Sequence, residues 1–194
     1  PEEVAWHLFQ FTYGWPWDKL YRMDFVRGMG LWYPSLSNSE DLVFVFQSLA
    51  LAKRIAVLDM TLAHHRVNRL ESVSHSRRVK PEAPFQALSL LKEALECRGL
   101  AEMFEHTFLN WGMEFLMWNI TNMEDKDAQR TYFRNLKQNW LPQMGFEKHP
   151  VSYYDNRITY AKYLLLKYSP YPVFAALLSA YRVCKGWRRS SVGG

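Results

Sequence analysis

The chain has 194 residues, of which 48% are hydrophobic and 22% charged, so it can bury the core of one ordinary domain and is too apolar to be a disordered chain. Its formal net charge of +5 indicates an anionic partner, although charge alone does not choose among phosphates, lipid headgroups and nucleic acid. Aromatic residues make up 16% of the chain, and rings in this number can bind sugars, lipid interfaces or bases as well as fill a core.

The first 80 residues predict a mixture of short helices, strands and loops. Gly14 and Pro16 break an initial apolar element. A helix is expected over residues 39–53, where apolar residues recur at helical spacing, and short buried strands are expected at residues 55–58 and 63–67.

The sequence from residue 81 onward predicts helices. Prolines open a helix that carries leucines at helical spacing and ends at Gly99. The next helix has an aromatic stripe that runs from Phe104 to Trp118, which is typical of a face buried in a core. A third helix is expected from Asp127 to Trp140, ending before Pro142, and two more follow. We therefore predict an α/β fold, predominantly helical, with domains at 1–80 and 81–194.

Two acidic residues follow a polar loop at Ser39-Glu40-Asp41. Ser37 and Glu40 have the spacing of a capping box, and acidic residues suit the positive end of a helix. A carboxylate at such a position can also accept a proton from a sugar hydroxyl. The two interpretations are compatible, because a cap would hold a base in place.

Two further motifs offer candidate ligand contacts. Trp15-Pro16-Trp17-Asp18-Lys19 combines rings that can stack on sugars with a carboxylate and a cation, although a core tryptophan beside a surface ion pair is the simpler explanation of the motif taken alone. In His64-His65-Arg66, adjacent histidines of a strand would point to opposite faces and could not share one metal. One histidine near a diphosphate, with the arginine on phosphate oxygens, is the functional interpretation, and a packed histidine is the alternative.

The C-terminal segment is basic and aromatic. No acidic residue follows Asp155, while seven Lys and Arg residues alternate with aromatic ones. This pattern favours an anionic membrane surface or an amphipathic helix docked on its own domain. Nucleic acid is not expected as a partner, because acidic residues are scattered through the middle of the chain.

Taken in order, these motifs resemble the second half of bacterial family 2 glycosyltransferases. The resemblance is carried by residues 17–22, 30–33, 39–44, 63–68 and 72–74, and fades after about residue 145. It implies the C-terminal part of a GT-A fold, followed by a helical extension, and inverting transfer from a nucleotide-sugar donor to a glycan or lipid-linked acceptor.

The resemblance also implies roles for individual residues. Asp41 would be the catalytic base, and Glu40 would hold the acceptor. The segment Trp17, Asp18 and Lys19 would line the acceptor side, while His64 or His65 with Arg66 would lie near the diphosphate. Divalent Mg²⁺ or Mn²⁺ is expected in the complete enzyme, since hard cations suit phosphate oxygens.

The donor-binding half, with its Asp-x-Asp metal motif, is expected to precede Pro1, so that this chain alone would be inactive. Asp125-Lys126-Asp127 has the same letters but lies in helical sequence, and we predict that it is a helix cap. With no signal peptide, and with two cysteines, Cys97 and Cys184, in no disulfide or metal pattern, the sequence predicts a cytoplasmic location, either free or peripheral on the inner face of the bacterial plasma membrane. A noncatalytic helical module that binds a membrane or a protein is the alternative function.

Overall fold

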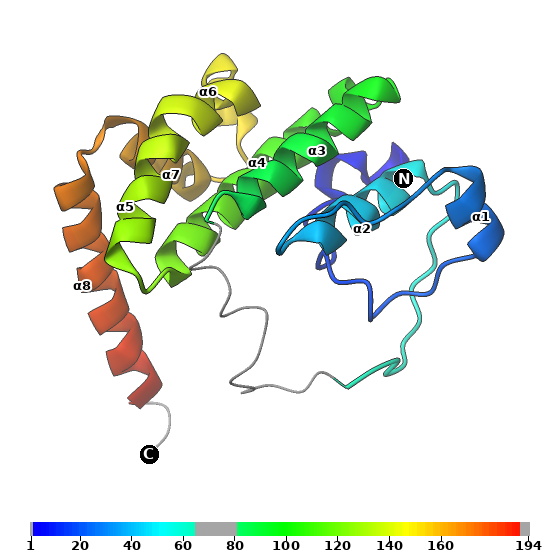
Figure 1. The fold of residues 1–194 in the computed structure, drawn as a ribbon, viewed down its shortest axis with the longest axis horizontal. Helices are drawn as coiled ribbons and strands as arrows, with labels where there is room; N and C mark the ends of the chain where they lie inside the picture. The colour runs from blue at the N-terminus through cyan, green and yellow to red at the C-terminus, as the bar shows by residue number, and fades with distance from the viewer. Residues whose placement is uncertain (1, 65–80, 191–194) are drawn as a thin grey trace. The chain divides into compact units, whose positions relative to one another are not determined.

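The structure is a computed structural model that describes the backbone of residues 2–64 and 81–190 and the side chains of residues 3–64 and 81–182. In these ranges the chain forms helices and no strand (Figure 1). The α-helices are α1 (Met23–Gly28), α2 (Glu40–Leu51), α3 (Ala83–Cys97), α4 (Ala101–Asn122), α5 (Lys126–Asn135), α6 (Leu141–Met144), α7 (Arg157–Tyr168) and α8 (Tyr171–Ser190). Short 3₁₀ helices lie at Glu2–His7, Phe146–Lys148 and Val151–Tyr153, and a π-helical turn at Leu136–Trp140.

The α/β prediction is therefore wrong for the described residues, and so is the expected C-terminal part of a GT-A fold, because that fold requires a sheet. The segment predicted as a strand at residues 55–58 has no regular structure, and Val57 and Leu58 are exposed. Of the second predicted strand, Ala63 and His64 are irregular, and the remainder lies outside the described residues. An apolar run becomes a strand only when a neighbouring strand pairs with its backbone, and no described segment does so.

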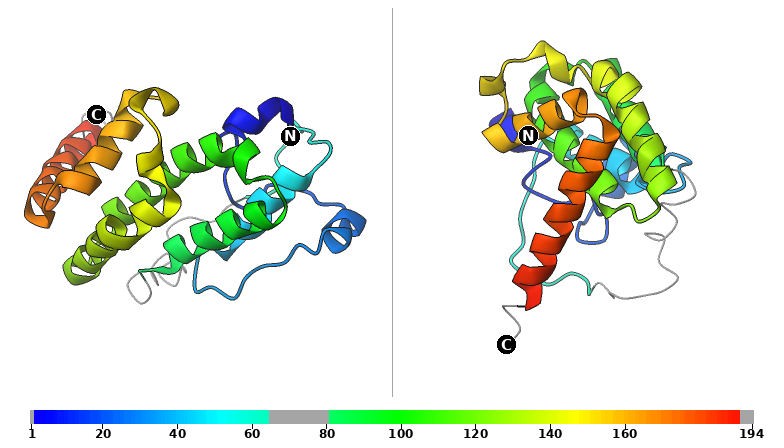
Figure 2. Two further views of the ribbon diagram at one scale, coloured as in Figure 1. Left: turned by 90° about the horizontal axis from the view of Figure 1, so that it is seen from above. Right: turned by 90° about the vertical axis from the view of Figure 1, so that its left-hand side faces the viewer.

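The chain divides into two compact units, Pro1–Leu116 and Met117–Gly194, called here the first and second units. The division falls inside α4. The predicted domain boundary at residue 80 falls in a part of the chain that the structure does not describe and remains a prediction. Helices α2 and α3, which come from the two sides of that boundary, pack against each other (Figure 2).

Helix α2 is the centre of the first unit. Apolar side chains around nearly its whole circumference are buried, rather than only the predicted face of residues 42, 46 and 49. The ring of Phe46 lies 4.7 Å from that of Phe9 and 4.6 Å from that of Trp111, between centroids. The helix is therefore covered by the N-terminal segment on one side and by α4 on another.

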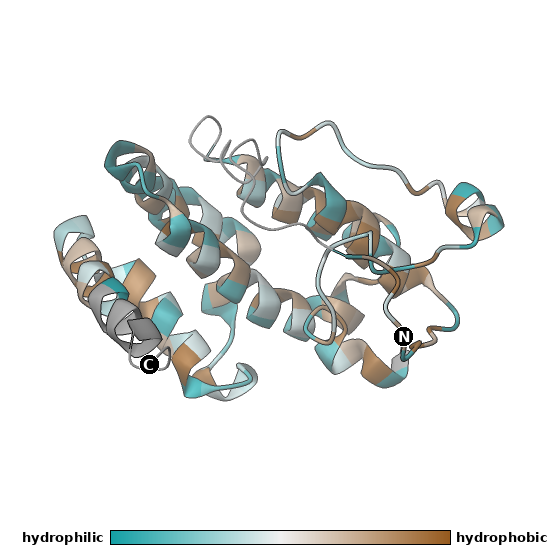
Figure 3. Ribbon diagram, turned by 90° about the horizontal axis from the view of Figure 1, so that it is seen from below, coloured by the Kyte–Doolittle hydropathy of each residue, from teal (hydrophilic) through white to brown (hydrophobic). Residues whose placement is uncertain are grey.

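Helix α3 follows its sequence prediction closely. Leu88, Leu91 and Leu95 are buried, and the glycine expected to end the helix, Gly99, has a φ of +66°, a conformation that favours glycine. Along the helices, hydrophobic and hydrophilic residues alternate as expected when one face is buried (Figure 3). The aromatic stripe of α4 is buried at Phe104, but Trp118 at its other end is 48% exposed.

The second unit is built around α5. The predicted cap is confirmed, because Asp125 Oδ1 accepts hydrogen bonds from the backbone N–H groups of Asp127 and Ala128 at 3.0 and 2.8 Å. The predicted helix end before Pro142 is wrong, since the chain continues through the π turn into α6 and stops at Gly145.

Candidate functional site

The predicted catalytic motif lies at the start of α2, in the first unit. The residue before the helix, Ser39, has a left-handed backbone with φ +64° and ψ +13°, and its side chain does not cap the helix. Its hydroxyl instead donates to Asn38 Oδ1 at 3.0 Å. The predicted capping box of Ser37 and Glu40 is therefore wrong, because the helix begins at Glu40, two residues later than that box requires. A non-glycine residue in this conformation stores strain, and such strain concentrates at functional sites.

Asp41 is half-buried in the first turn of α2. Burial raises the pKa of its carboxyl, and the neighbouring charge of Glu40 raises it further. Its Oδ1 accepts a hydrogen bond from the N–H of Leu42 at 3.0 Å, which partly opposes the rise in the pKa. Within the described ranges no Lys or Arg forms an ion pair with Asp41. A carboxylate held in this way is more basic than an ordinary aspartate.

A buried amide lies beside this turn. Asn38 is only 8% exposed, and its Nδ2 group has no hydrogen-bond partner among the described residues. A buried N–H group without a partner costs free energy, so this amide is a second strained feature next to Asp41.

Tyrosines connect the turn to the predicted acceptor segment. The ring of Tyr33 stacks on Phe44 of α2 at 4.4 Å, and Tyr21 meets the same ring edge-on at 5.1 Å. Partial burial raises the pKa of Tyr33, and the negative charges of Asp41 and Glu40 add to the rise.

Tyr21 continues the connection on the other side. Burial raises its pKa to about 12, with smaller contributions from Tyr33 and from the negative charge of Asp18. Asp18 and Asp41 therefore both act electrostatically on one aromatic cluster, formed by Tyr21, Tyr33 and Phe44.

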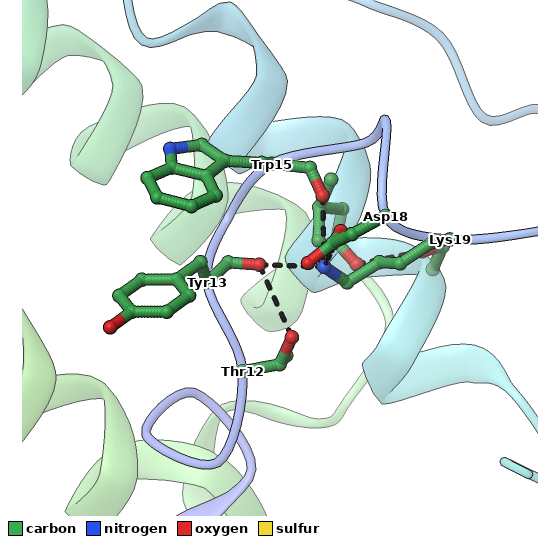
Figure 4. Close-up of polar contacts among 7 residues, drawn as sticks. Thr12, Tyr13, Trp15, Asp18 and Lys19 are labelled. Atoms are coloured by element: carbon green, nitrogen blue, oxygen red, sulfur yellow. Dashed lines mark hydrogen bonds and ion pairs between the residues drawn. The ribbon is translucent and has the colours of Figure 1, made fainter. Parts of the chain in front are cut away.

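The predicted acceptor segment forms a compact aromatic loop (Figure 4). The rings of Tyr13 and Trp15 stack at 4.5 Å, and those of Trp15 and Trp17 stack at 5.0 Å. The two indoles therefore contact each other as well as solvent, rather than presenting two separate faces. All three rings are exposed, and Tyr13 is the most exposed at 67%.

Lys19 holds this loop together. Its Nζ donates to the carbonyl oxygens of Tyr13 and Trp15, both at 2.8 Å, and to Asp18 Oδ1 at 2.6 Å (Figure 4). A lysine ammonium has three donors, and these three contacts use all of them. In this structure Lys19 therefore positions the aromatic rings, and Asp18 is the partner that neutralises its charge.

The structure thus places Trp17, Asp18, Lys19, Glu40 and Asp41 in the first unit. Asp18, Glu40 and Asp41 act electrostatically on the tyrosines of the aromatic cluster, whereas Trp17 and Lys19 belong to the aromatic loop. It gives no such place to His64, which is exposed on an irregular segment, and His65 and Arg66 lie outside the described residues. Sequence analysis did not identify Tyr13, Tyr21, Tyr33 or Asn38 as parts of the site. The available signal was position, since Tyr21 and Tyr33 lie inside the motifs at residues 17–22 and 30–33, and Tyr13 and Asn38 lie within two residues of Trp15 and Ser39.

The described residues contain no group of three or more His, Cys, Asp or Glu side chains that could hold a metal ion. No described helix is both long and apolar enough to cross a membrane. Comparison of the chain with protein-family models, with curated proteins and with solved structures gives no match.

Proposed function

We propose that this chain provides the acceptor side of a glycosyl transfer reaction, in which a sugar passes from a nucleotide-sugar donor to a glycan or lipid-linked acceptor with inversion at the anomeric carbon. The observation that carries the proposal is the half-buried Asp41 carboxyl, whose pKa is raised and which has no cationic partner among the described residues. Perturbed carboxyl groups of this kind are typical of catalytic bases.

Asp41 would act by removing the proton of the acceptor hydroxyl. The hydroxyl oxygen then forms a bond to the anomeric carbon of the donor, while the bond from that carbon to the diphosphate oxygen breaks and the diphosphate leaves with the electron pair. A carboxylate made more basic by burial takes the proton more readily than an ordinary aspartate does. Glu40, on the same helical turn, supports this role because its charge raises the pKa of Asp41.

The aromatic loop would bind the acceptor. Sugar rings have apolar faces that stack on aromatic side chains, and the exposed rings of Tyr13, Trp15 and Trp17 form one continuous stack. Asp18, although paired with Lys19, keeps carboxylate lone pairs that can accept hydrogen bonds from sugar hydroxyls. In this proposal Lys19 is a positioning residue that acts through the rings.

Asp41→Asn tests the base directly in the intact protein. Because loss of a general base typically costs about 10²–10⁴-fold in rate, we expect turnover to fall by that factor while acceptor binding is retained. Initial rates of nucleoside diphosphate release with a glycan acceptor measure the first quantity, and isothermal titration the second.

The matched control is Asp24→Asn, which changes an exposed aspartate paired with Arg22. It should leave turnover unchanged. Undiminished turnover in Asp41→Asn would contradict the role of Asp41 as the base, and an absence of turnover in the unaltered intact protein would favour a noncatalytic module.

Trp17→Ala tests the acceptor platform. Because stacking contributes about 0.5–1.5 kcal/mol per aromatic contact, we expect acceptor affinity to fall about 2–12-fold with little change in donor affinity. Titration of the intact protein with oligosaccharides, followed by calorimetry, measures both. Trp118→Ala, at an exposed tryptophan of the second unit, is the control and should keep full affinity. Equal affinity of Trp17→Ala and Trp118→Ala would exclude the aromatic loop as the platform.

A further inference from the structure

Helix α8 is attached to the second unit by one face only. Its buried residues are Phe174 and Leu178, at 2% and 6% exposure, and the ring of Phe174 lies 4.9 Å from that of Phe133 on α5. The two helices lie side by side in Figure 1. This contact fixes which side of α8 faces the unit and which side faces away.

Polar contacts hold the described part of α8 at both ends. At its start, the hydroxyl of Tyr171 donates to the backbone oxygen of Lys126 at 3.3 Å and lies 3.2 Å from Gln129 Oε1. Eleven residues further along, Arg182 Nη2 donates to the backbone oxygens of Thr121 and Met123 at 2.6 and 2.8 Å. The helix therefore cannot rotate to bury its other face without breaking these bonds.

The exposed surface of the described part of α8 is largely apolar, with Ser179 and Arg182 as its polar members. Val173, Leu177 and Tyr181, spaced by four residues, are 47%, 51% and 56% exposed. The small residues between them are also exposed, namely Pro172, Ala176 and Ala180. Soluble surfaces usually scatter single apolar residues, whereas an ordered row on one helix face indicates an interaction surface. We call these six residues the outer face of α8.

The charge of the surrounding sequence selects the partner. No Asp or Glu follows Asp155, and the basic residues there are Arg157, Lys162, Lys167, Arg182, Lys185, Arg188 and Arg189. Within the described side chains, Lys167 is paired with Glu147 and Arg182 is bound to carbonyl oxygens, but the segment as a whole retains a strong positive charge. A second copy of the same segment would repel it, while an anionic surface would attract it.

We propose that the outer face of α8 lies on an anionic lipid bilayer, parallel to the membrane plane. The apolar residues enter the boundary between headgroups and acyl chains, while the basic residues of the segment are attracted to lipid phosphates. Tyrosine at position 181 suits this boundary because its ring is apolar and its hydroxyl polar. The inference does not depend on the proposed glycosyl transfer, since it rests on α8 and on the charge of its own segment.

Co-sedimentation of the intact protein with vesicles tests the proposal. We expect binding to vesicles of phosphatidylcholine with phosphatidylglycerol, little binding to phosphatidylcholine alone, and a bound fraction that falls as salt is added. Val173→Asp and Leu177→Asp remove apolar contact and add a repelled charge, so each should lower the partition coefficient at least about tenfold.

The matched control is Val57→Asp, which makes the same change at a valine that is 85% exposed in the first unit. It should bind anionic vesicles as the unaltered protein does. Circular dichroism should show equal helix content in all four proteins, because the substituted side chains are exposed.

Four results would overturn the proposal. The first is an absence of binding to anionic vesicles by the unaltered protein. The second is equal binding by Leu177→Asp and Val57→Asp. The third is a dimer, detected by light scattering, that Leu177→Asp dissociates, because this would identify a second copy as the occupant. The fourth is binding of single-stranded nucleic acid by the unaltered protein that Leu177→Asp loses while it still binds vesicles, because this would assign the outer face of α8 to another partner.

Discussion

Helix α3 and the segment at residues 52–64 both belong to the first unit and both have strongly apolar sequences, yet they place their apolar side chains differently. Leu88 and Leu91 of α3 are 1% and 0% exposed, whereas Val57 and Met60 of the segment are 85% and 63% exposed. A helix satisfies its backbone hydrogen bonds internally and needs only a packing surface. An extended segment needs a neighbouring strand as well, and within the described residues none is present.

The comparison extends to the candidate site. Its side chains come from loops and from one helix start, so their geometry depends on a few specific contacts instead of a repeating pattern. Lys19 holds the aromatic loop through three hydrogen bonds, and Gly14 lets the same loop approach α2 closely. The exposed segment at residues 52–64 has no comparable contacts among those described for it.

The largest effect is expected from Phe46→Ala. This side chain is fully buried between Phe9 and Trp111, so its removal leaves a cavity and should lower the free energy of unfolding by about 3–5 kcal/mol. Val57→Ala, in the exposed segment, should change it by less than about 0.5 kcal/mol. Urea unfolding followed by circular dichroism measures both. Similar losses in the two variants would show that residues 52–64 are packed in solution and would break the comparison.

A smaller effect is expected from Gly14→Ala. A Cβ atom at this position would overlap Leu42 Cδ2 and lie 3.3 Å from Phe46 Cε2, so the buried Leu42 side chain must change its conformation or the loop must move away from α2. Overpacking of this kind typically costs about 1–3 kcal/mol. Gly28→Ala is the control, because a Cβ there meets no atom within 4 Å. Equal unfolding midpoints for the two variants would contradict the close packing of the loop on α2.

The smallest effect concerns Asp41 and pH. The pKa of Asp41 is higher in the folded chain than in the unfolded chain. At a pH between these two pKa values the folded chain therefore binds more protons than the unfolded chain. Its stability consequently falls as pH rises from the unfolded pKa to the folded pKa. Asp41→Asn should therefore raise the melting temperature slightly at neutral pH. The gain should disappear below the unfolded pKa of about 3.9, where the carboxyl is protonated in both states. Calorimetry against pH measures the difference, and a variant less stable than the unaltered protein at neutral pH would contradict it.

The same substitution thus links stability to function. If Asp41→Asn loses turnover and gains stability, the carboxylate is retained at a cost to the fold, as is common in active sites. A loss of both turnover and stability would indicate that Asp41 has a structural role at the start of α2.

Sequence patterns predicted α3 and the cap of α5 because both depend on residues close together in the chain. The leucine spacing of α3 specifies one buried face, and Asp125 bonds to N–H groups only two and three residues away. Pro142 gave a wrong prediction of a helix end, because the chain continues from the π turn at Leu136–Trp140 into α6. Resemblance of motifs identified Trp17 and Asp41, but did not indicate which tyrosines connect them.

The sequence by itself determined three features: the helices from residue 81 onward, the basic segment without acidic residues after Asp155, and the aromatic loop as a candidate binding segment. Only the tertiary structure decided that Lys19 holds that loop, that Tyr21 and Tyr33 meet on Phe44, and that α8 turns Phe174 inward and Leu177 outward. The physical reason is that spacing fixes which residues share a helix face. Which face is buried, and which distant residues meet, depends on the partners that the folded chain supplies.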